Sequence, residues 1–190
     1  LQATTKASIV NLITIGSGAN GTVLMGLHFF GNFGGLTMAN VGDITVKRCF
    51  FDGSLGITFP NGGTGVSDIT IAENYIGGSI NEENFANVIT NVTIRNNFIN
   101  GGISLVEADD QITNLVVIHN TFNYNGNSGL KNAEVAFNSF YQGNVIGTNN
   151  TLHDNISATD LPAGTNNDEV NMGNVYDLSL IHISEPTRPY

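Results

Sequence analysis

The sequence has little of what most binding and catalytic classes need. It holds only six lysine and arginine residues against sixteen aspartate and glutamate residues, a formal net charge of -10. A nucleic-acid partner is therefore not expected, because binding a phosphate backbone needs clustered positive charge. The single cysteine, Cys49, excludes an intrachain disulfide and leaves no cysteine pair for structural zinc. We expect Cys49 to be a small apolar residue inside a strand.

Long apolar runs are also missing. None approaches the roughly 18 residues that a membrane-spanning helix needs, so no transmembrane segment is predicted. No basic stretch precedes an apolar one, and no signal peptide is visible. Charged residues make up only 12% of the chain, whereas glycine numbers 23 and asparagine is abundant. This composition is typical of a turn-rich protein and not of a disordered or helical one.

One pattern recurs along the chain and is clearest at 91–105. An alternating apolar segment leads to an asparagine turn and an aromatic residue, and a glycine turn then precedes a second short apolar segment. The aromatic residues are 21 to 25 residues apart, at Phe29, Phe50, Tyr75, Phe98 and Phe122. We expect them to point inward, so that Phe98→Ala would lower the free energy of unfolding by about 3 to 5 kcal/mol. Weaker copies at 134–140 and 170–176 leave the register least defined between 130 and 170.

A parallel solenoid of β-strands explains this repeat, because each strand can pair with the equivalent strand one coil away, at roughly 4.8 Å. The sequence thus predicts an all-β parallel β-helix with coils of about 22 to 25 residues. Interior columns are expected at Ile44, Val46, Ile69, Ile71, Val92, Ile94, Val116 and Ile118. An asparagine column at the bend is expected at Asn96, Asn120, Asn138 and Asn150, with Asn74 and Asn97 beside it. Asparagine tolerates left-handed backbone and can bond to stacked neighbours, so this column is interpreted as structural.

The ends differ from this middle. Residues 1–22 suit an incoming coil or a cap, and residues 23–177 form the predicted β-helix. Residues 178–190 abandon the pattern, carry two of the four prolines, and resemble a translated sequencing-adapter tail. We expect this last segment to be non-native and to contribute nothing to folding.

The unit Val-x-Ile-x-Asn-Asn-x-Phe, followed by Gly-Gly-Ile-x-Leu, resembles the repeat of pectin-lyase-like proteins over about residues 23–176. That family includes pectate lyases, polygalacturonases, alginate epimerases, phage tailspikes and uncharacterised secreted bacterial surface proteins. The resemblance implies a right-handed helix and an extracellular or cell-surface location. It selects no activity, because many chemistries share the scaffold.

In the enzymes of that family, catalytic and calcium-binding groups lie on the outer face of the strand after the glycine turn. By alternation, the outward side chains there are Thr58, Asn81, Ser104 and Lys131, and these are candidates for binding a substrate. This row has no carboxylate pair for acid–base hydrolysis, and Lys131 alone cannot supply both base and cation for lyase chemistry. We therefore expect no catalytic residue in this chain. The alternative is a polysaccharide lyase, hydrolase or epimerase whose catalytic coils are missing or unrecognised.

Three further groups are candidates for binding. Acidic residues occupy corresponding loops of adjacent coils and could hold Ca²⁺, or could simply be solvated: Glu82, Glu83, Glu107, Asp109 and Asp110. A basic stripe, which could bind an acidic glycan or merely balance charge, is predicted along Lys47, Arg95 and His119, with Ala72 between them. The residues after the aromatic column could present rings to sugars or be buried beneath the corner: Phe30, Phe51, Ile76, Ile99 and Tyr141.

Together these features predict part of a secreted or cell-surface β-helix that offers an elongated polysaccharide- or surface-binding face. The expected partner is an acidic polysaccharide, and no cofactor is expected unless the acidic loops hold Ca²⁺. The remaining alternative is a structural stalk or adhesin spacer that uses the same coils and binds nothing.

Overall fold

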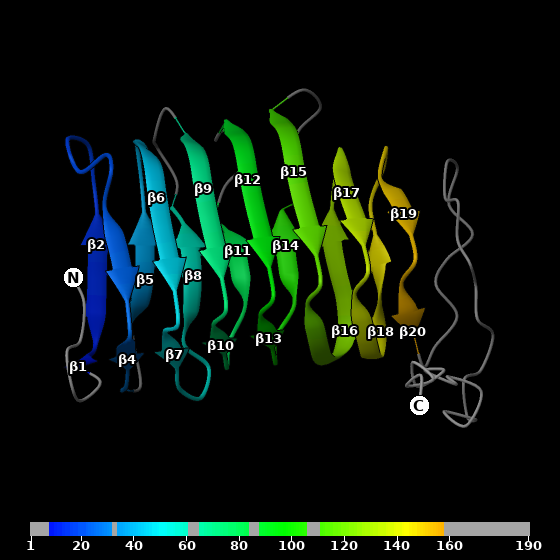
Figure 1. Ribbon diagram of the computed structural model, residues 1–190, viewed down its shortest axis with the longest axis horizontal. Helices are drawn as coiled ribbons and strands as arrows, with labels where there is room; N and C mark the ends of the chain where they lie inside the picture. The colour runs from blue at the N-terminus through cyan, green and yellow to red at the C-terminus, as the bar shows by residue number, and fades with distance from the viewer. Residues whose placement is uncertain (1–7, 32–33, 61–64, 84–87, 106–110, 158–190) are drawn as a thin grey trace, which may run out of the picture.

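The chain folds into a parallel β-solenoid, which confirms the predicted all-β fold. The structure is a computed structural model that describes residues 8–31, 34–60, 65–83, 88–105 and 111–157. These residues form twenty strands and no helix, stacked in chain order along one axis (Figure 1). Every pairing between the strands is parallel.

Each coil contributes strands to three rows. The first row is a seven-stranded sheet of β3 (Val23–Met25), β6 (Val41–Lys47), β9 (Val66–Ala72), β12 (Ile89–Arg95), β15 (Ile112–Ile118), β17 (Ala133–Ala136) and β19 (Thr151–His153). The second row contains β1 (Ser8–Val10), β4 (Leu27–Phe29), β7 (Phe50–Phe51), β10 (Tyr75–Ile76), β13 (Phe98–Ile99), β16 (Thr121–Leu130), β18 (Ser139–Ile146) and β20 (Ile156–Ser157). The third row contains β2 (Leu12–Ile15), β5 (Gly35–Met38), β8 (Gly56–Phe59), β11 (Ile80–Glu82) and β14 (Ile103–Leu105). The long strand β16 pairs with both β13 and β14 and so joins the second and third rows.

Coil length follows from one interior position that bonds to its equivalent in the next coil. Successive residues at this position, from Cys49 to Asn155, are 25, 23, 23, 18 and 17 residues apart. The last two coils are thus shorter than the predicted range. This shortening is the reason that the sequence pattern alone left the register after residue 130 undefined.

The hydrophobic core fills the space between the rows. In the first row, the six predicted interior residues from Ile44 to Ile94 are buried, as expected. The predictions for Val116 and Ile118 were wrong, because Leu115 and Val117 occupy those columns and pair with Val92 and Ile94. Residues 115–118 are all apolar, so alternation could not define which of them face inward.

The aromatic column was partly misassigned. Phe29 and Phe122 are buried as predicted, whereas Phe50, Tyr75 and Phe98 are 41%, 37% and 36% exposed. The interior positions in those coils belong to the next residue, since Phe51, Ile76 and Ile99 are fully buried. Two adjacent apolar residues in a two-residue strand cannot both face inward. In the coil of Phe98 the interior residue is Ile99, so Phe98→Ala should not carry the high stability cost. Among the aromatic residues of this row, we expect that cost at the fully buried Phe51.

The preceding asparagine could have resolved this ambiguity. Asn74 is buried, Tyr75 is exposed and Ile76 is buried, and the same alternation runs through 97–99. Counting asparagine as an inward residue, and not as a turn residue, would have given the correct phase. Residues 158–190 lie outside the described part, and so do the predicted repeat at 170–176 and the tail at 178–190.

Candidate functional site

Every complete coil turns from the first row into the second through one left-handed residue. The first of them is Gly26, with φ 69°, and the others have φ between 51° and 58° and exposed side chains, at Arg48, Glu73, Asn96, His119, Phe137 and Asp154. This turn column runs along the solenoid beside the last outward residues of the first row. Side chains from successive coils are therefore brought together at one corner, at roughly the strand spacing of 4.8 Å.

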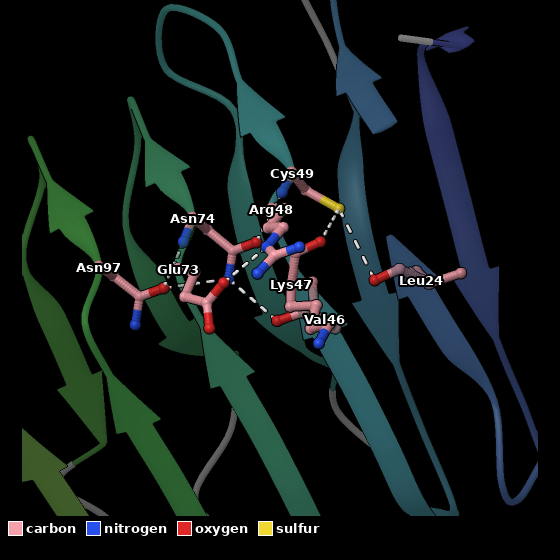
Figure 2. A network of polar contacts seen from close by, with 8 residues as sticks. All are labelled: Leu24, Val46, Lys47, Arg48, Cys49, Glu73, Asn74 and Asn97. Atoms are coloured by element: carbon pink, nitrogen blue, oxygen red, sulfur yellow. Dashed lines mark hydrogen bonds and ion pairs between the residues drawn. The ribbon is translucent and has the colours of Figure 1, made fainter. Parts of the chain in front are cut away.

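An interior asparagine ladder follows directly after the turn column and fixes the coils to one another. Its members are Asn74, Asn97, Asn120, Asn138 and Asn155. The Oδ1 of Asn97 accepts bonds from the backbone N–H and the Nδ2 of Asn74, at 2.9 and 3.0 Å, and the Nδ2 of Asn97 donates to the carbonyl of Ile71 at 3.0 Å (Figure 2 shows Asn74 and Asn97). The same pattern recurs to Asn155, so each buried amide satisfies groups in the coil before it.

This finding separates two roles that the predicted asparagine column combined. Asn120 and Asn138 belong to the ladder, as predicted, and Asn74 and Asn97, which were expected beside the column, are members of it too. Asn96 instead has the left-handed backbone and lies in the exposed turn column. Asn150 was wrongly aligned. Its side chain lies outside the ladder, where it accepts a bond from the backbone N–H of Ala133 and donates to the carbonyl of Leu130.

Cys49 occupies the ladder position of its coil and is buried, as predicted, but it lies between strands β6 and β7 and not inside a strand. Its backbone N–H donates to Asn74 Oδ1 at 2.9 Å, and its Sγ lies 3.4 Å from the carbonyl of Lys47 and 3.9 Å from that of Leu24 (Figure 2). Leu24 is the register equivalent of Val46, the carbonyl that Asn74 uses. The thiol thus makes a weaker version of the ladder bond, and burial raises its pKa above 9.0.

We expect Cys49→Asn to extend the ladder by one coil. The new Nδ2 can donate to Leu24, so stability should rise by about 1 kcal/mol, the net value of a neutral hydrogen bond. Urea denaturation compared with Cys49→Ala checks this. A variant less stable than Cys49→Ala would contradict the equivalence of the two positions.

The basic stripe exists, but its membership differs from the prediction. Lys47 and Arg95 both pair with Ala72, so they share one outward column on strands two coils apart. The next residue in that column is Ile118, and His119 lies one position later, in the turn column. The prediction for His119 was wrong by one residue because it relied on the misaligned aromatic column. We call Lys47, Arg48, Glu73 and Arg95 the cationic corner.

Within the cationic corner, Arg48 and Glu73 form an ion pair. The Arg48 Nε donates to Glu73 Oε2 at 2.7 Å, between the turn residues of two successive coils (Figure 2). The hydrogen bond and the charge of Arg48, with smaller contributions from Lys47 and Arg95, hold the pKa of Glu73 below its ordinary value. Glu73 thus stays ionised and offsets one of the three positive charges.

The outer row of the third-row strands offers hydroxyl and amide groups. Thr58, Asn81 and Ser104 are aligned by pairing, and Thr37 precedes them. Lys131 was wrongly placed in this row, because Gly129 pairs with Ser104 and Lys131 itself is buried. The aligned row Thr37, Thr58, Asn81, Ser104 contains no carboxylate.

The acidic residues proposed for Ca²⁺ are only partly described. Glu82 is half-buried, and its backbone pairs with that of Phe59 on the neighbouring strand, while Glu83 is exposed. Glu107, Asp109 and Asp110 lie outside the described residues. Among the residues that are described, no three His, Cys, Asp or Glu side chains are arranged to hold a metal ion.

Comparisons of the chain with family models, curated proteins and solved structures give no match. Any function must therefore be inferred from the fold and the arrangement of side chains. The described segments also contain no helix able to span a membrane.

An exposed aromatic ladder lies beside the cationic corner on the second row. Phe50, Tyr75 and Phe98 stack with ring centroids 4.5 and 5.4 Å apart and planes within 9° of parallel. His28 closes one end by meeting Phe50 edge-on at 5.0 Å. Because the ring faces cover one another, the ladder presents ring edges to solvent and no broad platform for a sugar ring. Of the aromatic residues that the sequence suggested for sugar binding, Phe30 and Tyr141 are exposed and Phe51 is buried.

A third cluster occupies the far end of the turn column. His119 stacks on Phe137 at 5.1 Å, and Phe137 meets His153 edge-on at 5.5 Å. His153 also contacts Asp154 through Nδ1 at 2.9 Å and Glu134 through Nε2 at 3.4 Å. The Asp154 hydrogen bond is the main reason that the pKa of His153 is raised above 6.5. Sequence analysis missed this cluster because it lies where the register was undefined.

We expect the protonated His153 to help hold β19 against β17. Because its pKa is raised in the folded state, the stabilisation should be complete below about pH 6.5 and lost as pH rises through the raised value. The effect should be small, below about 1 kcal/mol, since the groups are partly exposed. Imidazole shifts in an NMR titration check the direction. Asp154→Asn should lower the pKa of His153, and an unchanged midpoint would contradict the contact.

Proposed function

We propose that this chain forms a secreted or cell-surface β-solenoid that binds an acidic polysaccharide along the cationic corner. The observation that carries the proposal is the position of the positive charge. Three of the six lysine and arginine residues in a chain of net charge -10, namely Lys47, Arg48 and Arg95, lie at this one corner, on two coils that are separated by a single coil. Such a concentration gives an acidic protein one local site of attraction for an anion.

The shape of the corner suits an extended polymer. Lys47 and Arg95 are two coils apart in one column, so their backbones are separated by roughly 10 Å along the solenoid axis. A polymer with regularly spaced carboxylates or sulfates can lie along that axis and meet both cations. The coils are held rigid by the asparagine ladder, which lowers the entropy lost on binding. The adjacent aromatic ladder adds electropositive ring edges, which also favour anionic oxygen atoms.

Two further points support this choice. The repeat unit resembles that of pectin-lyase-like proteins, several of which act on uronic acid polymers outside the cell. The aligned outer row Thr37, Thr58, Asn81, Ser104 offers no carboxylate pair or base, which favours binding without turnover. Lyase or hydrolase activity would require groups in coils other than these.

The proposal is tested by measuring affinity for polygalacturonate, alginate and chondroitin sulfate by calorimetry at several salt concentrations. Arg95→Ala should weaken binding about three- to tenfold, and Glu73→Gln should strengthen it, because the first removes a cation and the second removes an anion. Thr93→Val, two residues before Arg95 on β12, is the matched control and should leave the affinity unchanged. Binding that does not respond to salt or to either charge variant would contradict the proposal. Unsaturated products or new reducing ends would show an enzyme instead.

A structural stalk is the second candidate, and the Arg48–Glu73 ion pair favours it. This pair links two coils at 2.7 Å and is a sufficient structural reason for both residues. If none of the three polymers binds and Glu73→Gln lowers stability, the corner serves to hold the coils together.

A further inference from the structure

A groove of about 280 Å³ crosses the start of the first-row strands β6, β9 and β12, at the opposite end of these strands from the cationic corner. Polar groups on successive coils line it: Asn20, Gly42, Ser67 and Thr90. Gly42, Ser67 and Thr90 are aligned by strand pairing. The groove therefore runs along the solenoid axis and not along one strand.

The hydrogen bonds in the groove leave amide and hydroxyl groups that can bond to a ligand. The Oδ1 of Asn20 accepts the backbone N–H of Gly42 at 3.0 Å, which orients the amide and leaves Nδ2 as its donor. The Oγ1 of Thr90 lies 3.2 Å from the Oγ1 of Thr113 and can accept from it, so the Thr90 hydroxyl keeps its own proton to donate. Ser67 lies between these two residues and adds a hydroxyl group.

The remaining walls define the kind of ligand. Val66 and Val88 supply apolar surface, and Val88 is 44% exposed. The absence of a side chain at Gly42 keeps the groove open, since a Cβ there would lie 2.9 Å from Ser67 Oγ. None of the described lining residues is charged, whereas Asp43 and Asp68 lie exposed in the next position of the same strands. These carboxylates disfavour an anion at this end of the sheet.

We infer that this groove binds a neutral saccharide, a separate ligand from the acidic polymer proposed for the cationic corner. A sugar offers hydroxyl groups to the donors and acceptors of Asn20, Ser67 and Thr90, and its C–H face can contact Val66 and Val88. The volume lies just below the range of about 300 to 1,000 Å³ that is usual for drug-sized ligands. It suits one or two rings of a chain that continues along the solenoid axis.

Titration of the ¹⁵N-labelled chain with cellohexaose and with mannohexaose tests this site by NMR. At least one of them should shift the backbone signals of Gly42, Ser67 and Thr90 with a millimolar Kd, and a galacturonate hexamer should not. Thr90→Val and Ser67→Ala should each weaken binding about three- to tenfold, the change expected for one lost hydrogen bond. Thr93→Val, on the same strand outside the groove, should not change it. The inference is overturned if neither neutral sugar shifts these signals, or if Thr93→Val weakens binding as much as Thr90→Val.

Discussion

Replacing Asn97 with alanine should destabilise the protein by about 3 to 5 kcal/mol, because three buried polar groups lose their partner at once. Those groups are the backbone N–H and the Nδ2 of Asn74 and the carbonyl of Ile71, each bonded to the Asn97 amide at 2.9 to 3.0 Å. Each buried group without a partner costs about 1 to 3 kcal/mol, and partial relaxation lowers the sum. The measurement is the free energy of unfolding from urea denaturation.

Asn100→Ala is the matched control for this prediction. Asn100 belongs to the same coil but is exposed, and its side chain only accepts a bond from Asn123 at 2.9 Å. A surface substitution of this kind should change stability by no more than about 0.5 kcal/mol. Equal effects of Asn97→Ala and Asn100→Ala would show that the ladder is not buried.

Phe51→Ala should also lower the free energy of unfolding by about 3 to 5 kcal/mol, since it opens a cavity in the core. Phe51 is fully buried and stacks on Phe29 with ring centroids 4.3 Å apart. Its neighbour Phe50 provides the control, because it is 41% exposed and touches mainly Tyr75 and His28 in the aromatic ladder. Phe50→Ala should cost about 1 kcal/mol, the value of an aromatic pair.

The order of these two effects tests the register. If Phe50→Ala were the more damaging substitution, the column of Phe50, Tyr75 and Phe98 would face the core. The sequence-based alignment implied that outcome. Thermal or urea unfolding of the two variants side by side distinguishes the two registers.

Much of the fold could be predicted because a solenoid repeats its local chemistry. Alternation in segments such as 44–46 and 92–94 identified the first-row strands and their buried face, since a polar residue separates the apolar ones. The coil length followed from the spacing of the aromatic residues. The structure confirms both inferences for the coils up to Asn120, whereas the next two coils, of 18 and 17 residues, are shorter.

Phase errors arose where the sequence is locally degenerate. At 50–51 and 98–99 both residues are apolar, and at 115–118 four are, so hydrophobicity cannot define which of them point inward. Buried asparagine misled the interpretation further, because a polar side chain counts as exposed unless its bonding partners are known. Those partners come from a neighbouring coil, 17 to 25 residues away, and no local pattern reveals them.

The candidate sites were harder to predict for the same reason. One shift in phase moved His119 out of the basic stripe, and a two-residue difference in register removed Lys131 from the outer row. Glu73 was not considered, although its contact with Arg48 decides how much charge the cationic corner presents. The groove at Gly42, Ser67 and Thr90 could not be foreseen, because it is formed by residues from four coils.

The most direct test of the whole account is the hydrogen exchange of asparagine side chains, measured by NMR after transfer into D₂O. A solenoid held by an interior ladder predicts that the Nδ2 protons of Asn74, Asn97, Asn120 and Asn138 exchange as slowly as the backbone amides of β12. The exposed Asn91 and Asn114, which also bond between coils but at the surface, should exchange within the first spectrum. Rapid exchange of all these side chains would contradict the ladder, and with it the register that places the cationic corner and the groove on the surface.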